Sequence, residues 1–253
     1  MQLRPLYWKV AITFLIFSCF LKPNKMFSQK ITLKSDYLKE ERIINVNLPD
    51  NYDSSKTNYP VIYVFDGDVL FDYVSALFKY NYDIYPQAII VGVNQKERHK
   101  ELVPFEKEEK IHNNFLKFIN KELLTKIESD YRTNNFNILI GHSNGGYFSL
   151  ICMLENQKIN YAISISPIIW GKYEKNIKLK LKEYSSVNQN KIYFGFADGD
   201  HSAFQKGAVK LNSFIKNNPK LKIESYIEEY SNEDHNSSIL IGARKGLDKI
   251  FEN

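Results

Sequence analysis

One hexapeptide limits the folds open to this chain more than any other feature. The segment Gly141–Gly146 (GHSNGG) follows the apolar run Phe136–Ile140 and precedes the helix-like stretch Tyr147–Leu154. Together they match the strand, the sharp G-x-S-x-G turn and the helix of a nucleophile elbow. The backbone of such a turn is strained and crowded, so its flanking glycines avoid a collision with the neighbouring strand or helix. The turn lifts Ser143 out of the backbone, where a base can reach its hydroxyl.

The rest of the chain alternates between strand-like and helix-like segments, which predicts an α/β domain with a mostly parallel sheet. Apolar strand-like runs stand at residues 42–48, 60–65, 88–93, 161–165, 191–196 and 221–228, and helical spacing at 111–129 and 237–251. We find no repeat and no linker rich in Pro, Gly or Ser. The organisation expected is a targeting segment, residues 1–28, followed by one domain, residues 29–253.

Polar residues follow the last two predicted strands, where the ligands of a parallel sheet bind. Asp198 and Asp200 come after one strand, and His235 comes after the next. With Ser143 they give the order serine, acid, histidine that is typical of α/β-hydrolases. Asp198 is favoured as the acid because it is nearer to the strand end, with Asp200 as the alternative. His201 is the rival base, although it would need an acid from elsewhere.

An oxyanion that forms during attack on a carbonyl needs two backbone N–H donors. One is expected from Asn144, the residue after the serine. The other is expected from the loop Asp66–Asp68, through the N–H group of Asp68. Arg98 and Trp170 are candidates for the wall of a substrate pocket.

The N-terminus has the pattern of a signal peptide. Arg4 and Lys9 precede the apolar run Val10–Leu21, which is too short to span a bilayer. Cleavage is expected after Ser28, so the mature protein would be exported to the periplasm or the medium without a membrane span. A lipoprotein anchor at Cys19 is less favoured because a bulky residue stands two positions before it, and an uncleaved anchor is the remaining alternative.

The charge balance changes once this segment is set aside. The whole chain has a net charge of +5, but residues 1–28 carry four basic residues and no acid, which leaves a net charge of +1. No basic patch therefore indicates a nucleic-acid partner. Cys19 and Cys152 are the only cysteines, so the mature chain has no intramolecular disulfide. No Cys or His spacing predicts a metal site, and no cofactor is expected.

Several segments together resemble one known family. They are Leu48–Tyr52 (LPDNY), Tyr59–Gly67 (YPVIYVFDG), Ile90–Val93 (IVGV) with Arg98 and Pro104, Asp130–Arg132 (DYR) and Ser164–Trp170 (SISPIIW). On these residues the chain resembles the "Putative esterase" (esterase D-like) family of α/β-hydrolases, over most of its length. That family includes feruloyl esterases, S-formylglutathione hydrolases, siderophore esterases of the enterochelin type and mycolyltransferases.

The resemblance implies an α/β-hydrolase fold, with a mostly parallel central sheet and helices on both faces. It also implies Ser143 as nucleophile, His235 as base, and Asp68 and Asn144 as oxyanion donors. The siderophore-esterase branch often has Glu at the acid position, where this chain has Asp198. The choice between Asp198 and Asp200 therefore stays open.

The function expected is a serine esterase that cleaves a small-molecule carboxylic ester through an acyl-enzyme. Two alternatives remain: an acyltransferase that uses the same three residues, and an inactive member of the fold that serves in binding. The sequence specifies neither the ester nor the oligomeric state.

Overall fold

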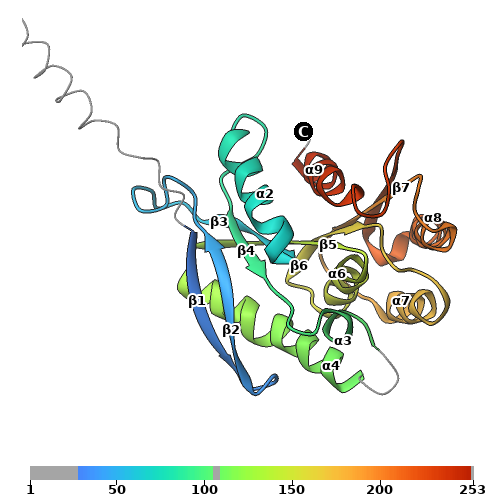
Figure 1. Ribbon diagram of the computed structural model, residues 1–253, viewed down its shortest axis with the longest axis horizontal. Coiled ribbons are helices and arrows are strands. Elements are labelled where there is room, and N and C mark those ends of the chain that lie inside the picture. The colour runs from blue at the N-terminus through green and yellow to red at the C-terminus, as the bar shows by residue number, and fades with distance from the viewer. Residues whose placement is uncertain (1–27, 105–108, 252–253) are drawn as a thin grey trace, which may run out of the picture.

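The computed structural model describes residues 28–104 and 109–251, which form an α/β domain around one sheet (Figure 1). The sheet has eight strands in the order β1-β2-β4-β3-β5-β6-β7-β8. Their bounds are β1 Ser28–Ser35, β2 Glu40–Asn47, β3 Tyr59–Phe65, β4 Ile89–Val93, β5 Thr133–His142, β6 Ile159–Ile165, β7 Asn190–Ala197 and β8 Ile223–Tyr230.

The sheet is mostly parallel, as the alternating pattern predicts. The hairpin of β1 and β2 is antiparallel and joins the sheet through an antiparallel pairing of β2 with β4. All other neighbouring strands pair in parallel. The central strands β3 and β4 are buried at every residue, because helices cover both faces. The strand β1 was not predicted: five of its eight residues are exposed, so it lacks a continuous apolar run.

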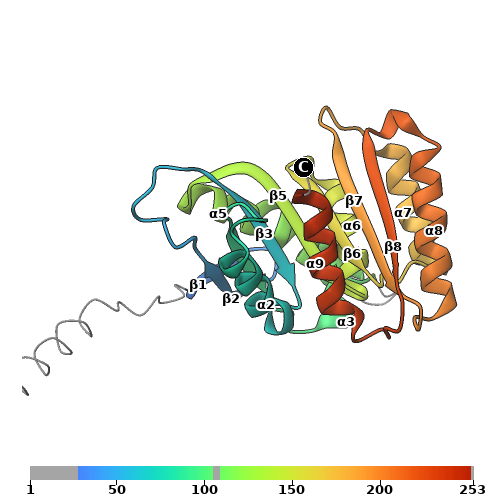
Figure 2. The same cartoon turned by 90° about the horizontal axis from the view of Figure 1, so that it is seen from above.

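Helices lie on both faces of the sheet (Figures 1 and 2). Helices α2 and α9 pack on one face, and the remaining helices on the other. Their bounds are α2 Gly67–Tyr80, α3 Arg98–Leu102, α4 Glu109–Lys117, the π-helical turn η1 Phe118–Leu123, α5 Leu124–Asp130, α6 Asn144–Glu155, α7 Gly171–Glu183, α8 Ser202–Lys216, the 3-10 turn η2 Pro219–Leu221 and α9 Ser238–Phe251.

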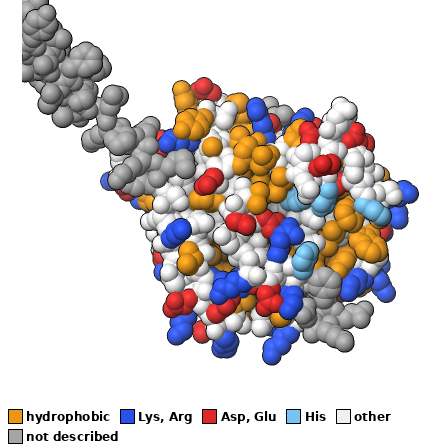
Figure 3. Space-filling model, viewed as in Figure 1, with side chains coloured by type: hydrophobic (Ala, Val, Ile, Leu, Met, Phe, Trp, Pro, Cys, Tyr) orange, Lys and Arg blue, Asp and Glu red, His pale blue; other side chains and the backbone are white. Residues whose placement is uncertain are grey.

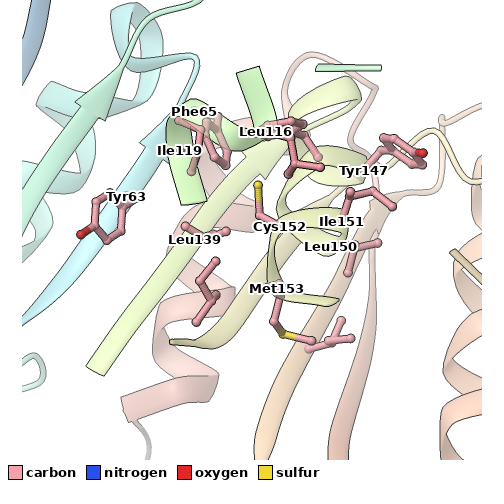
Figure 4. Packing of buried hydrophobic residues seen from close by; sticks show 14 of the residues in the cluster. Tyr63, Phe65, Leu116, Ile119, Leu139, Tyr147, Leu150, Ile151, Cys152 and Met153 are labelled. Atoms are coloured by element: carbon pink, nitrogen blue, oxygen red, sulfur yellow. The ribbon is translucent and has the colours of Figure 1, made fainter. Parts of the chain in front are cut away.

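The larger apolar core lies between the sheet and helix α6 (Figure 4). Helix α6 is buried along almost its whole length, including Cys152, which is a free thiol with a pKa raised by burial. Apolar residues from β3, β5 and the α4–η1 segment pack around it. Because this helix starts at the hexapeptide, its burial fixes the turn in place.

The predicted targeting segment and its alternative anchor at Cys19 fall outside the described residues, except that Ser28 is the first residue of β1. Across residues 28–104 and 109–251, no helix is long and apolar enough to cross a membrane.

Candidate active site

The hexapeptide forms a strained turn between β5 and α6. Ser143 has φ 57° and ψ −113°, an unfavourable conformation for a residue with a side chain. Its N–H group donates to the carbonyl oxygen of Ile165 at 2.8 Å, which ties the turn to the end of β6. A Cβ atom on Gly141 would overlap the backbone of Gly145. The turn therefore requires glycine at the position where the sequence has it.

His235 reaches this serine from the loop between β8 and α9. Its Nε2 lies 3.0 Å from Ser143 Oγ, and its Nδ1 lies 2.6 Å from Asp200 Oδ1. A carboxylate only accepts hydrogen bonds, so Nδ1 carries the proton and Nε2 is left to accept from the serine hydroxyl. The three side chains come from the carboxyl ends of β5, β7 and β8, which the parallel sheet brings to one edge.

Of the two candidate acids, the structure brings Asp200, and not the favoured Asp198, to His235. A tight turn lets the N–H group of Asp200 donate to the carbonyl oxygen of Ala197 at 3.1 Å, which points the chain back toward the sheet. The Asp198 carboxylate is exposed and accepts from the N–H groups of Asn232 and Glu233, at 2.9 and 3.2 Å. Nearness to the strand end was the wrong criterion, because the turn reverses the direction of the chain.

The Asp200 carboxylate is fully buried and accepts hydrogen bonds from three donors, one of which is His235. Its Oδ2 accepts from Ser166 Oγ at 2.6 Å and from the N–H group of Ala197 at 2.8 Å. Burial raises the pKa of Asp200, but the hydrogen bonds from His235, Ser166 and Ala197 outweigh it, so the pKa lies below its ordinary value. The carboxylate therefore stays charged beside the imidazole.

Two side chains that the sequence pattern did not single out for this role hold the backbone of His235. His142 Nε2 lies 2.6 Å from the carbonyl oxygen of His235, and the two rings are 4.6 Å apart. Ser238 Oγ lies 2.9 Å from the same oxygen and 2.8 Å from Ser166 Oγ. Burial, with His235 nearby, lowers the pKa of His142 to about 4, so its ring is neutral at neutral pH.

The loop predicted to supply an oxyanion donor lies against the elbow. An added Cβ on Gly145 would stand 3.3 Å from Asp66 Oδ2, so the β3–α2 turn touches the start of α6. Asp66 precedes α2 and makes no side-chain hydrogen bond to it. Asp68 and Asn144 each stand in the first turn of a helix, where backbone N–H groups lack intrahelical partners.

The two predicted pocket residues have different surroundings. Arg98 is at the site, but its guanidinium contacts the protein itself: Nε and Nη2 donate to Asp66 at 2.5 and 2.7 Å.

Trp170 precedes α7 and is 52% exposed. The segment with Trp170 packs tightly on α8, since a Cβ added to Gly207 would collide with the carbonyl of Ile169.

An aromatic surface borders His235 on helix α8. The ring of Phe204 lies 5.7 Å from that of His235 and 5.6 Å from that of His201. His201, the rival base, instead precedes α8 and accepts from the N–H group of Ala203 at 3.2 Å. Figure 3 shows histidine side chains grouped beside apolar and charged ones on the face in view. Phe204 was not predicted, because one aromatic residue in an amphipathic helix is not distinctive.

No group of three or more His, Cys, Asp or Glu side chains in the described ranges is arranged to hold a metal ion. The candidate site consists instead of a hydroxyl, an imidazole, a carboxylate and helix N-termini. That set suits attack on a carbonyl carbon by an oxygen nucleophile.

The fold and the site define an α/β-hydrolase. Residues 35–242 match the family model described as "Putative esterase". The chain belongs to this family and is a hydrolase that acts on esters. A search of the curated proteins found no match for it.

Solved structures of similar fold include several esterases. An IroE-like serine hydrolase from Shewanella oneidensis is 24% identical, with a TM-score of 0.81 over 89% of this chain and 80% of its own. The siderophore hydrolase EstA from Aspergillus nidulans is 18% identical, with a TM-score of 0.73 over 89% and 93%. The enterobactin and salmochelin hydrolase IroE is 17% identical, with a TM-score of 0.69 over 90% and 97%. At these identities the likeness establishes the fold.

Proposed function

We propose that the protein is a serine esterase that works through an acyl-enzyme, with Ser143, His235 and Asp200 as its catalytic triad. The observation that carries the proposal is the continuous chain of contacts from Ser143 Oγ to His235 Nε2 at 3.0 Å and from Nδ1 to Asp200 at 2.6 Å. A serine hydroxyl is a weak nucleophile until a neutral imidazole takes its proton, and this geometry supplies that base.

The reaction has two halves. Ser143 Oγ attacks the ester carbonyl carbon while its proton passes to His235 Nε2, and the imidazolium is stabilised by Asp200. The oxyanion is stabilised by the N–H groups of Asn144 and Asp68. The alcohol then leaves with the proton from Nε2. Water, deprotonated by the same nitrogen, attacks the acyl-enzyme and releases the carboxylic acid.

Substitution of the serine tests the proposal directly. With p-nitrophenyl acetate and butyrate, we expect Ser143→Ala to lower kcat by at least about 10³-fold, because no other hydroxyl occupies the elbow. A fluorophosphonate probe should label the wild-type protein on the peptide that contains Ser143. The control is Ser129→Ala, which removes an exposed hydroxyl on α5. Wild-type turnover by Ser143→Ala would refute the proposal.

The substrate proposed is a small-molecule ester. Because Phe204 stands beside His235, one group of the ester is expected to pack on an aromatic ring. A panel of short acyl, feruloyl and trilactone siderophore esters would rank the substrates. The last class is included because the solved structures of similar fold include a siderophore hydrolase and an enterobactin and salmochelin hydrolase. Added alcohol acceptors in the same assay would reveal acyl transfer as an ester product.

We also propose that the protein is exported, on the basic and apolar pattern of residues 1–28. Expression of the full chain followed by N-terminal sequencing of the exported form tests this. The expected first residue is Gln29. A product that begins at Cys19 and carries lipid would instead support the lipoprotein alternative.

A further inference from the structure

The short helix α3 extends two consecutive side chains to the elbow. Arg98 binds Asp66 through Nε and Nη2 at 2.5 and 2.7 Å, and its Nη2 also lies 3.1 Å from the carbonyl oxygen of His142. His99 Nδ1 lies 2.8 Å from Asn144 Nδ2, the amide group that donates in this pair. The two residues therefore contact both segments that contain the proposed oxyanion donors.

The contact with Asp66 fixes the first of these segments. Asp66 has φ 56° and ψ 47°, a left-handed conformation that is strained outside glycine. Such a conformation persists only where its surroundings hold it. Its N–H group donates to Gln95 Oε1 at 3.1 Å, and its buried carboxylate is held by Arg98. The next two residues, Gly67 and Asp68, begin α2, so the direction of their N–H groups depends on this turn.

The contacts with His142 and Asn144 fix the second segment. The guanidinium of Arg98 joins the Asp66 carboxylate to the last carbonyl of β5, immediately before Ser143. One planar group thus links the β3–α2 turn to the elbow. The hydrogen bonds to Asp66 raise the pKa of Arg98, which keeps this link charged.

A buried ion pair anchors helix α3 to strand β2. Glu101 is 2% exposed and pairs with Arg42 of β2, which is 5% exposed. The Glu101 carboxylate also accepts from the N–H group of Lys96 at 3.2 Å, and its carbonyl oxygen lies 3.0 Å from His112 Nδ1. The helix therefore has little freedom to move relative to the sheet.

We propose that Arg98 is a positioning residue, which holds the two oxyanion-donor segments at a fixed separation, and that it does not bind substrate. The inference rests on the serine esterase mechanism proposed above. It differs from the sequence expectation, which placed Arg98 in the wall of the substrate pocket. The two roles predict different kinetics, because a displaced oxyanion donor weakens binding of the transition state, whereas a lost substrate contact weakens binding of the ground state as well.

The test uses a neutral substrate, p-nitrophenyl butyrate, and the variants Arg98→Gln, Arg98→Lys and Asp66→Asn. We expect Arg98→Gln to lower kcat by about 10- to 100-fold, with KM changed less than about twofold. Arg98→Lys should recover only part of the loss, because one ammonium cannot reproduce the fork that joins Asp66 to His142. The double variant Asp66→Asn/Arg98→Gln should be no slower than the worse single variant, since both remove the same link.

The matched control is Arg244→Gln on α9, where the arginine is 55% exposed and pairs with Asp248 at 3.8 Å. It should keep the wild-type kcat. A wild-type kcat in Arg98→Gln, or an effect confined to KM, would overturn the inference. Ser143→Ala is assayed in parallel. If Ser143→Ala is inactive while Arg98→Gln is fully active, only the positioning role of Arg98 is refuted. If Ser143→Ala is fully active, the esterase mechanism itself is refuted.

Discussion

The two aspartates after β7 give the sharpest test of the site. They are only two residues apart, but Asp200 contacts His235, whereas Asp198 contacts the backbone of the following loop. In Asp200, one oxygen accepts from His235 Nδ1 at 2.6 Å, and the other accepts from Ser166 Oγ and the N–H group of Ala197 at 2.6 and 2.8 Å. An asparagine has only one acceptor oxygen. In Asp200→Asn, two donors would hold that oxygen, which turns the amide NH₂ toward His235.

That rotation has a predictable consequence for the imidazole. A donor that faces Nδ1 forces the proton onto Nε2, which would then donate to Ser143 instead of accepting its proton. Loss of the correct tautomer costs about 10³- to 10⁴-fold in kcat, or roughly 4 to 5.5 kcal/mol of activation free energy. The fold should be retained, because the side-chain volume hardly changes.

Asp198→Asn is the matched substitution. It weakens one of the two hydrogen bonds to the backbone of residues 232 and 233, at a cost of about 1 kcal/mol in the free energy of unfolding. Its kcat should stay within about tenfold of wild type, because the carboxylate does not touch His235. Both variants are assayed with p-nitrophenyl butyrate and unfolded in urea. If Asp198→Asn loses 10³-fold while Asp200→Asn stays active, the assignment of the acid is wrong.

Two further predictions concern stability. His112 and His142 both have a pKa of about 4, lowered first by burial, whereas an unfolded histidine titrates near 6.5. Between these two pKa values the unfolded state binds more protons than the folded state. Each histidine should therefore lower the free energy of unfolding by about 2 kcal/mol when the pH falls from 8 to 5. Urea unfolding of His112→Gln should show a flatter dependence on pH; an unchanged slope would contradict the assignment. Gly141→Ala should destabilise the fold by about 3 kcal/mol or more, because the new Cβ would overlap the backbone of α6. Gly145→Ala, whose Cβ has its nearest neighbour at 3.3 Å, should cost less, and equal melting temperatures would count against the packing argument.

The local pattern of the sequence determined the secondary-structure elements and the sharp turn that carries Ser143. Apolar runs bounded by turn residues predicted the strands from β2 to β8 within a few residues. The runs are most continuous in β3, β4, β6 and β7, because burial on both faces of the sheet requires apolar residues at nearly every position. The sequence predicted the elbow because such a strained turn requires glycine at fixed positions around the serine. The order of serine, acid and histidine also followed from the sequence, since each stands just after a strand of a parallel sheet.

The tertiary structure decided which polar groups meet. Asp198 and Asp200 have the same side chain and nearly the same place in the sequence, and only the turn after β7 sends one to His235 and the other to the next loop. Arg98 looked free to bind substrate, but the parallel pairing of β3 with β4 and β5 brings it between Asp66 and the elbow. Such contacts depend on side-chain direction and on segments far apart in the chain, which local spacing does not encode.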